Sequence, residues 1–164
     1  MNRYADFESP LGRILLVSDG SLLTGAYFSG QKYEPSPGPG WRREPDLEIF
    51  RDASRQLREY FAGKHRQFDI PLRLQGTPFQ MQVWNSLLEI PLGTTVSYGE
   101  LAGRIKRKEA VRAVGAAVGR NPVSIIVPCH RVIGSSGSLT GYAGGLERKR
   151  ALLDLEAAVL AEDP

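Results

Sequence analysis

The residues of this chain most able to do chemistry are a cysteine and the histidine directly after it. Cys129 is the one cysteine in the sequence, and it lies with His130 in the segment 128–132, which reads PCHRV. A thiol attacks as the thiolate, and an ordinary cysteine is mostly protonated at neutral pH. A reactive Cys129 therefore needs a base, which His130 can supply while Glu156 orients the imidazole ring.

The spacing alone leaves the relation between thiol and imidazole open. In an extended backbone, adjacent side chains point to opposite faces, so Cys129 and His130 touch only where the chain turns, and a bridging water can otherwise relay the proton. From these residues alone, two other interpretations remain. One is a buried thiol beside a surface histidine with no chemistry, and the other is a Cys–His hydrolase, which needs a direct contact that adjacency in sequence makes awkward.

Composition excludes several classes of protein. The chain has 164 residues, of which 41% are hydrophobic and 24% charged, as in ordinary globular domains. One cysteine cannot form an internal disulfide and offers little for a zinc site, so we expect no metal and no cofactor. No stretch has the roughly 18 to 20 apolar residues that span a bilayer, and residues 1–12 lack the apolar core of a signal peptide. We expect a cytoplasmic protein with no membrane partner.

Positive charge is concentrated in one part of the sequence. Residues 98–150 contain ten Lys or Arg and three acidic residues, a net +7, so the rest must carry −4 to give the chain's +3. A basic half joined to an acidic half suggests a polyanionic partner, such as nucleic acid, for the basic half. A solvated basic surface is the alternative, and charge alone does not decide between the two.

The first part of the chain is typical of a small α/β unit. Apolar runs on either side of Asp19-Gly20 predict a β-hairpin over residues 13–28. Little chemistry is visible here, so we expect a structural role for this part. The remaining predicted segments are a Pro- and Gly-rich loop over 29–45, a helix over 47–61 that stops at Gly63, and an extended piece over 66–74.

Two capping boxes mark helix starts in the second part of the chain. Residues 77–80 (TPFQ) and 97–100 (SYGE) each place a hydroxyl N-cap three residues before Gln or Glu. The first box predicts a helix that ends before Pro91, and we place a domain boundary just ahead of it. The predicted domains are a structural α/β domain over residues 1–75 and a second domain over 76–164 that carries the chemistry.

The second capping box begins a pattern of two short helices. They are predicted over 98–105 and 109–119, and the basic turn Lys106-Arg107-Lys108 joins them. Two short helices with a short polar turn, inside the basic half, resemble a helix-turn-helix, although helical hairpins are common.

Small residues in the second of these helices admit two interpretations. Ala110, Ala113 and Gly115 allow a neighbouring surface to approach closely. That surface is either the protein core or a DNA groove, and Arg112 among them favours the groove.

The last part of the sequence contains the thiol of Cys129 and the carboxylate of Glu156. Residues 124–127 (SIIV) predict a short β-like run into PCHRV, and a final amphipathic helix begins at Leu146 and carries Glu156. The predicted fold class is therefore α/β (α+β), with a small N-terminal sheet-and-helix unit followed by a mostly helical domain.

Five ordered motifs resemble those of one family of DNA repair proteins. They are SYGELA (97–102), RAVG (112–115), Asn121-Pro122, PCHRV (128–132) and GYAGGL (141–146). In this order and spacing they resemble the O6-alkylguanine-DNA alkyltransferases, also called methylated-DNA–protein-cysteine methyltransferases, over essentially residues 77–156. PCHRV alone is suggestive, whereas five ordered motifs are highly specific.

The resemblance implies an activity and a partner. The family moves the alkyl group of O6-alkylguanine irreversibly onto its own cysteine, so Cys129 is the expected acceptor and one molecule repairs one lesion. His130 is similar to the residue that takes the thiol proton through a water, with Glu156 holding the imidazole. The expected partner is double-stranded DNA bearing O6-alkylguanine, bound through a winged helix-turn-helix-like element by a monomer that packs cooperatively along DNA. The expected location is a bacterial cytoplasm, in association with the nucleoid.

The resemblance also implies roles around a base flipped out of the duplex. Arg112 matches the finger that fills the vacated space, and Tyr98 matches the hydroxyl that donates to guanine N3. The carbonyls of Cys129 and Val132 receive the guanine amino group, and Asn121 braces turns around the site. The other implied residues are Tyr142, Ala143 and Gly144 at the pocket wall, Ala110, Ala113 and Gly115 at the DNA, and Lys106, Arg107 and Lys108 toward phosphates.

This sequence departs from the family pattern in instructive ways. Many members carry Ser at the position of Ala143, so a hydroxyl contact is lost here, and a backbone N–H could still reach the alkylated oxygen. Some relatives bind zinc in their N-terminal domain through Cys and His ligands that this chain lacks. Some binding-only relatives lack the acceptor cysteine, and the presence of Cys129 argues against that variant. The alternative function is a helix-turn-helix module that binds DNA or a lesion without chemistry.

Overall fold

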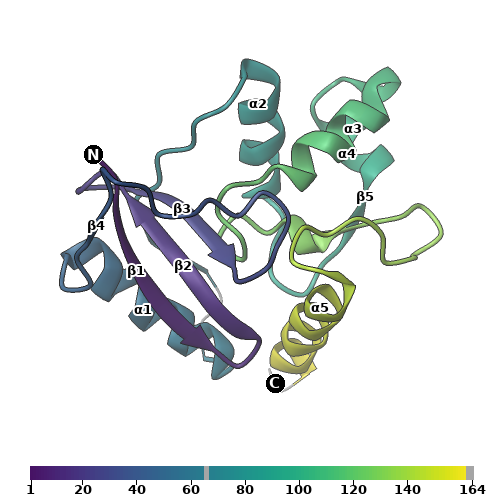
Figure 1. The fold of residues 1–164 in the computed structure, drawn as a ribbon. Coiled ribbons are helices and arrows are strands. Elements are labelled where there is room, and N and C mark those ends of the chain that lie inside the picture. The colour runs from purple at the N-terminus through teal and green to yellow at the C-terminus, as the bar shows by residue number, and fades with distance from the viewer. Residues whose placement is uncertain (65–66, 162–164) are drawn as a thin grey trace.

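The computed structural model describes residues 1–64 and 67–161, and these form a mixed α/β fold in two adjoining parts. Figure 1 shows the N-terminal sheet with a helix along one of its faces and the remaining helices gathered beside it. The predicted fold class, a sheet-and-helix unit followed by a mostly helical part, is therefore confirmed. No helix in the described part of the chain is long and apolar enough to cross a membrane.

The N-terminal sheet is built around the hairpin that the sequence predicts. Strand β2 (Gly12–Ser18) pairs antiparallel with β3 (Leu23–Phe28), and the Asp19 carboxylate accepts the N–H groups of Ser21 and Leu22 in the turn between them. The sheet order is β3-β2-β1-β4, and its two other strands are β1 (Arg3–Ser9) and β4 (Arg42–Arg43).

Helix α1 (Glu48–Phe61) packs against this sheet, as its apolar spacing predicts. Its buried face ends at Tyr60, which is 2% exposed. Gly63 follows with φ 76°, a left-handed conformation that favours glycine, and so ends the helix where the sequence indicates.

The chain after α1 is less regular than predicted. The expected extended segment 66–74 begins outside the described residues. Within the described part, Leu72 makes a single β-bridge with Leu23 and no longer ladder forms around it. The segment therefore lies beside the start of the edge strand β3 without becoming a strand of the sheet.

Both capping boxes form in the second part of the chain. The side chains of Thr77 and Ser97 each accept the backbone N–H three residues on, and they begin helices α2 (Pro78–Leu87) and α3 (Tyr98–Arg104). Helix α4 (Val111–Gly119) packs against both of these helices. The predicted helix-turn-helix is thus formed by α3 and α4.

The second helix of this pair begins later than predicted. Lys108–Ala110 is a turn of 3-10 helix, and the α-helix begins at Val111 rather than at Glu109. Lys106 adopts φ 60°, in the left-handed region, so the chain reverses inside the basic turn before a regular helix starts.

The predicted β-like run 124–127 is wrong. The chain turns there, with Ile125 at φ 71°, and the Val127 N–H donates to the Val123 carbonyl. All four residues of the run are buried. A short apolar run can mark burial as well as a strand, and here burial alone explains the composition.

Two short strands and the last helix complete the second part. Strand β5 (Val96–Ser97) pairs parallel with β6 (Val132–Ile133), which follows the PCHRV segment. Helix α5 (Leu146–Ala161) forms where predicted, and its buried face carries Glu156.

The two parts share one hydrophobic core, which includes Phe28 from the sheet and Leu152 from α5. Main-chain hydrogen bonds cross the junction: the Ala26 N–H donates to the Pro122 carbonyl at 2.8 Å, and the Ser124 N–H donates to the Ala26 carbonyl at 2.9 Å. The turns that lead to Cys129 are therefore anchored on strand β3 of the N-terminal part.

Candidate active site

Cys129 lies in a tight turn rather than in an extended segment. Cys129–Arg131 forms a turn of 3-10 helix, and the Val132 N–H donates to the Cys129 carbonyl. The extended backbone considered from the sequence is therefore wrong at this point. With three residues per turn, adjacent side chains still diverge by about 120°, so Cys129 and His130 leave the turn in different directions. The thiol is buried, with 4% of the residue exposed.

His130 is buried with the Glu156 carboxylate against its Nε2. The distance from Nε2 to Glu156 Oε2 is 2.6 Å, and both side chains are at most 1% exposed. Because Nε2 faces a carboxylate, we assign the proton of the neutral imidazole to Nε2, which leaves Nδ1 as the acceptor. Nδ1 is buried without a hydrogen-bond partner among the described residues, and it is the atom free to take a proton.

The Glu156 carboxylate is held by donors from two further residues. Arg131 donates through Nε to Oε1 at 2.8 Å and through Nη2 to Oε2 at 3.0 Å, and the Tyr60 hydroxyl donates to Oε2 at 2.6 Å. Burial alone would raise the pKa of Glu156, but the hydrogen bond with His130 and the pairing with Arg131 hold that pKa well below its usual range. Glu156 is therefore ionised at neutral pH.

The thiol and the imidazole are both neutral at neutral pH. Burial raises the pKa of the Cys129 thiol to about 11, although a hydrogen bond with Asn121 and the charge of Lys149 act in the opposite direction. Burial also lowers the pKa of His130, against the opposing effect of Glu156. Attack by sulfur must therefore be accompanied by proton transfer to the imidazole.

Lys149 belongs to the site, and the sequence interpretation did not single it out. Its Nζ donates to the Thr140 carbonyl at 2.8 Å and lies 6.0 Å from the centroid of the Tyr98 ring. Burial lowers the pKa of Lys149 to about 8, and its charge lowers the pKa of the Cys129 thiol. A signal was present, because Lys149 lies two helical turns before Glu156 and so on the same face of α5.

Tyr98, whose hydroxyl is expected to donate to guanine N3, has partners of its own in this structure. The hydroxyl donates to the carbonyls of Thr140 and Gly141, at 3.2 and 3.4 Å. Its ring lies against Gly115 of α4, where an added Cβ would be 3.8 Å from the ring. A ligand that receives this hydroxyl has to replace two backbone carbonyls.

Asn121 braces the chain that leads to the thiol. Its Nδ2 donates to the Val127 carbonyl at 2.8 Å, and its Oδ1 accepts the Val123 N–H at 3.0 Å. Val132 is buried and begins β6 directly after the thiol turn. The structure thus brings both residues beside Cys129, and their roles in binding a base stay predictions.

The expected pocket wall is only partly as predicted. Tyr142 and Ala143 line a groove, but Gly144 is buried behind them. A Cβ added at Gly144 would come within 2.6 Å of the Tyr142 ring and 3.2 Å of Phe28. Gly144 therefore allows the wall to pack against the N-terminal part of the chain and is not on the wall's surface.

The groove has a volume of about 740 Å³, and one face of α4 forms a side of it. Ala113 and Ala116 on this face are exposed, whereas Val114, Ala117 and Val118 point into the core. The small residues of α4 therefore divide between the two interpretations, and those on the groove side leave room for a large partner to approach.

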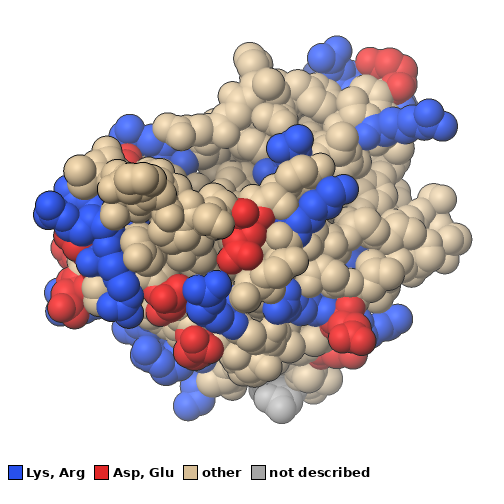
Figure 2. Space-filling view, in the orientation of Figure 1, with Lys and Arg blue, Asp and Glu red and all other residues tan. Residues whose placement is uncertain are grey.

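Of the predicted DNA-contacting residues, Ala113 and Gly115 line this groove, and the others lie outside it. Arg112 and the basic turn Lys106–Lys108 are exposed, while Ala110 and Gly115 are half-buried. In Figure 2 basic side chains project from the part of the surface over α3 and α4. The positive part of the sequence is thus displayed beside the groove.

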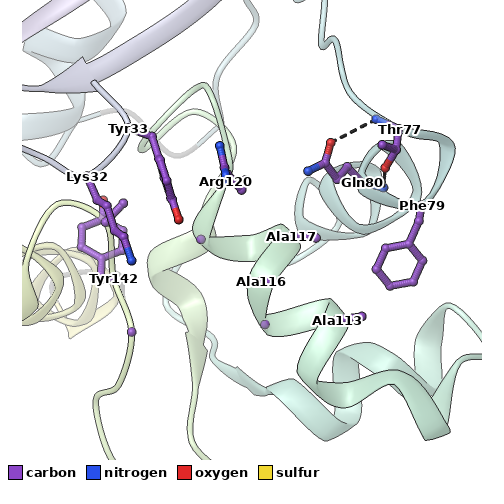
Figure 3. Close-up of a pocket in the computed structure, with 14 residues that line it drawn as sticks. Lys32, Tyr33, Thr77, Phe79, Gln80, Ala113, Ala116, Ala117, Arg120 and Tyr142 are labelled. Atoms are coloured by element: carbon purple, nitrogen blue, oxygen red, sulfur yellow. Dashed lines mark hydrogen bonds between the residues drawn. The ribbon is translucent and has the colours of Figure 1, made fainter. Parts of the chain in front are cut away.

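The opposite bank of the groove comes from the predicted loop 29–45. Lys32 and Tyr33 line it, and the Lys32 N–H donates to the Ala143 carbonyl at 3.0 Å. The guanidinium of Arg120, just after α4, lies 3.8 Å from the centroid of the Tyr33 ring, and Figure 3 shows the two side by side. Together with Tyr60, these residues show that the N-terminal part contributes side chains to the groove and to the Glu156 carboxylate, and its expected structural role stays a prediction.

Together, the fold and the site define a class of protein. An exposed basic helix-turn-helix and a buried thiol with an imidazole–carboxylate pair lie in the same half of the chain. That combination of features is typical of a DNA-binding protein in which a thiol is the reacting group. No cluster of Cys, His, Asp and Glu in the described residues could hold a metal ion.

Two models of one protein family together match nearly the whole length of the chain. Residues 78–158 match the family model of the 6-O-methylguanine DNA methyltransferase DNA binding domain, and residues 2–74 match that of its ribonuclease-like domain. The chain belongs to this family. The predicted domain limits, 1–75 and 76–164, stay predictions.

Relatives and solved structures agree with this assignment. Methylated-DNA–protein-cysteine methyltransferases of Mycobacterium tuberculosis and Methanosarcina acetivorans are 53% and 52% identical, covering 95% and 94% of this chain and 93% and 98% of their own lengths. The crystal structure of Mycobacterium tuberculosis O6-methylguanine methyltransferase matches with a TM-score of 0.88 at 52% identity, covering 96% of this chain and 94% of that one. The structure of OGT of the same organism in complex with DNA matches with a TM-score of 0.91, at the same identity and coverage.

Proposed function

We propose that this protein repairs DNA containing O6-alkylguanine by moving the alkyl group irreversibly onto its own Cys129. The observation that carries the proposal is the single buried thiol beside the His130–Glu156 pair, in a chain of the 6-O-methylguanine DNA methyltransferase family. The DNA complex of the Mycobacterium tuberculosis relative supports DNA as the partner.

The transfer is a displacement at the alkyl carbon. Sulfur of Cys129 forms the new S–C bond while the bond from carbon to O6 breaks, and its electron pair passes to the guanine ring. The thiol proton goes to Nδ1 of His130 through a water, and the resulting imidazolium is stabilised by Glu156 at its other nitrogen. The guanine anion takes one proton from solvent and becomes an ordinary base, and the imidazolium returns the thiol proton to solvent, so atoms and charge balance.

Stabilisation of the departing guanine falls to Tyr98. Its hydroxyl exchanges the carbonyls of Thr140 and Gly141 for guanine N3, where it meets the negative charge that develops on the ring. The carbonyls of Cys129 and Val132 accept the guanine amino group. Adenine has no amino group at that position, so these acceptors select for guanine.

Access to the base depends on the exposed face of α4. The target atom lies inside the duplex, so the nucleotide has to be flipped out at a cost of a few kcal/mol. Arg112 is exposed on this face and fills the vacated space, while Ala113 lets the helix come close to the groove of the DNA. The basic turn Lys106–Lys108 contacts phosphates.

The product makes the protein a single-use reagent. The thioether carbon is a poor target for water, and the only thiol of the chain is consumed in forming it. Each molecule therefore repairs one lesion. It acts as a monomer that packs cooperatively along DNA, in the cytoplasm and in association with the nucleoid.

Mass spectrometry tests this function directly. Incubation with duplex DNA containing O6-methylguanine should add one methyl group to the peptide that contains Cys129, up to one equivalent per protein. Repeated turnover, or a methyl group on another residue, contradicts the proposal. Because the chain has one cysteine, the label cannot move to another thiol.

The Cys129→Ser variant separates transfer from mere binding. It should lose all methyl transfer while it still binds the alkylated duplex, because the exposed face of α4 is unchanged. A variant that clears the lesion as well as the wild type would favour the alternative, a helix-turn-helix module that acts without its own chemistry.

A further inference from the structure

Tyr60 brings the N-terminal part of the chain into contact with the charged network behind the thiol. Its hydroxyl donates to Glu156 Oε2 at 2.6 Å, and His130 Nε2 lies against that same oxygen at 2.6 Å. Tyr60 lies outside the five sequence motifs, on helix α1, and is separated from Glu156 by 96 positions. One carboxylate oxygen is therefore shared between the proposed base and a residue of the N-terminal part.

Packing fixes the direction of the Tyr60 hydroxyl. The ring meets Phe61 edge-on, with 5.3 Å between centroids, and lies 5.4 Å from the ring of Phe68. Burial raises the pKa of Tyr60 well above its usual value, and the negative charge of Glu156 acts in the same direction. The hydroxyl thus keeps its proton at every working pH and acts as a permanent donor to the carboxylate.

From this contact we infer that Tyr60 is a positioning residue for proton transfer from Cys129 to His130, an inference that rests on the proposed function. Its hydrogen bond fixes the rotation of the Glu156 carboxylate about the imidazole. It also draws electron density from the oxygen that His130 faces, and so weakens the hold of the carboxylate on an imidazolium. His130 consequently stays neutral, and able to accept the thiol proton, down to a lower pH.

Other charged or titratable groups lie near His130 and Glu156 and also affect the pKa of His130. The charges of Arg131 and Lys149 lower the pKa of His130, on which burial has the largest effect. Tyr142, which lines the groove, is coupled electrostatically to Cys129 and to Glu156. Loss of the Tyr60 hydroxyl leaves all of these groups in place, so its contribution can be measured alone.

The test is Tyr60→Phe in the full chain, which removes one oxygen and keeps the ring packing. Single-turnover methyl transfer is measured against pH with duplex O6-methylguanine DNA, and the reaction of free O6-benzylguanine is measured in parallel. The acid limb of the rate profile should shift to higher pH by about half a pH unit to one unit, since Glu156 then holds an imidazolium more strongly. On that limb the rate should fall roughly three- to tenfold with both substrates.

A second measurement follows the imidazole itself. The chain has two histidines, so the His130 resonance can be assigned by NMR with little overlap, and its titration should move upward in Tyr60→Phe. The matched control is Tyr27→Phe, which removes a largely buried hydroxyl from strand β3 and should leave both the rate profile and the His130 titration unchanged.

The outcomes are distinct. An unshifted acid limb in Tyr60→Phe overturns the inference, and so does a loss of thermal stability without that shift, because a purely structural tyrosine behaves in this way. An equal shift in Tyr27→Phe overturns it as well. A wild-type protein that transfers no methyl group instead contradicts the proposed function, before any variant is compared.

Discussion

The network behind Cys129 and the groove along α4 both take most of their residues from the second part of the chain, but they are built differently. In the network, the charges are buried and paired: Glu156 takes hydrogen bonds from Arg131 and Tyr60 and lies against His130. Along the groove, Ala113 and the charged residues are exposed to solvent. The proton-transfer groups are thus already paired in the folded protein, whereas the side chains along the groove are still in contact with solvent.

This difference gives a rule for separating their contributions. A change in the buried network alters the reacting groups, so it should slow transfer from duplex DNA and from a free alkylated base alike. A change in the groove should affect only the duplex, because a free base needs no flipping. The following variants test the rule, beginning with the largest expected effect.

Glu156→Gln should be the most damaging change that leaves Cys129 in place. Removing the carboxylate charge leaves the Arg131 guanidinium buried without its counter-ion, which should lower the free energy of unfolding by about 3 kcal/mol or more. Transfer should slow at least roughly 100-fold with both substrates, the scale of a lost general base. Single-turnover kinetics and denaturant unfolding measure the two effects, with the exposed Glu147→Gln as control. A loss confined to duplex DNA would break the rule.

The same carboxylate predicts a pH dependence of stability. The pKa of Glu156 in the folded protein lies below its ordinary value of 4.5, so its stabilising contribution is complete above that pH and is lost as pH falls through the folded pKa. The stability gap between wild type and Glu156→Gln should therefore narrow below about pH 4.5. Unfolding curves over the acid range measure it, and a gap that widens toward acid contradicts the assigned charge.

Arg112→Ala should affect duplex DNA and spare the free base. Without a side chain to fill the vacated space, the flipped state loses part of the stabilisation that offsets the few kcal/mol cost of flipping, so transfer from the duplex should slow roughly ten- to 100-fold. Reaction with free O6-benzylguanine should change less than about twofold. Arg150→Ala, an exposed arginine on α5, is the control. Equal losses on both substrates would refute the finger role.

Lys149→Met should slow transfer with both substrates by about tenfold. The Lys149 charge lowers the pKa of the Cys129 thiol, so its removal should raise that pKa by about one unit while the apolar side chain keeps the site filled. The rate of alkylation of Cys129 by iodoacetamide against pH measures the shift. A thiol that titrates as in the wild type would show that Lys149 does not affect the pKa of Cys129.

Tyr33→Ala should have the smallest effect, and only with duplex DNA. Tyr33, on the bank opposite α4, pairs with Arg120 at the end of α4, and an exposed cation–π contact contributes about 0.5–1 kcal/mol. Transfer from the duplex should slow about two- to fivefold, and Arg120→Ala should add little to it, because the two side chains act as one unit. A change in the rate with free O6-benzylguanine would show that Tyr33 affects the transfer step itself.

Local sequence predicted local structure well. The capping boxes at Thr77 and Ser97, the Asp19-Gly20 turn and the stop at Gly63 each depend on a few neighbouring residues, and all four form. Strand β1 was not predicted, although it joins the sheet. The run 124–127 failed as a strand because a short buried turn and a short buried strand have the same apolar composition.

The site shows the same division. The PCHRV motif marked Cys129 and His130, the resemblance implied Glu156 as the partner of the imidazole, and the structure places the imidazole against that carboxylate. Tyr60 was visible only as a core residue of its helix, because its partner lies 96 positions away. Tyr33 lies in a loop whose composition indicates only irregular backbone.

The sequence by itself singled out the thiol and the imidazole as the candidate reacting groups, since a lone thiol, an adjacent imidazole and ordered motifs are properties of residue type and spacing. It also determined the helix starts, because caps are local. Only the tertiary structure decided the protonation of the thiol and the imidazole, since their pKa values depend on burial and on charges brought from other elements. It alone also decided that the N-terminal part supplies Tyr60 and Tyr33 to the site, because packing brings together residues that the chain keeps far apart.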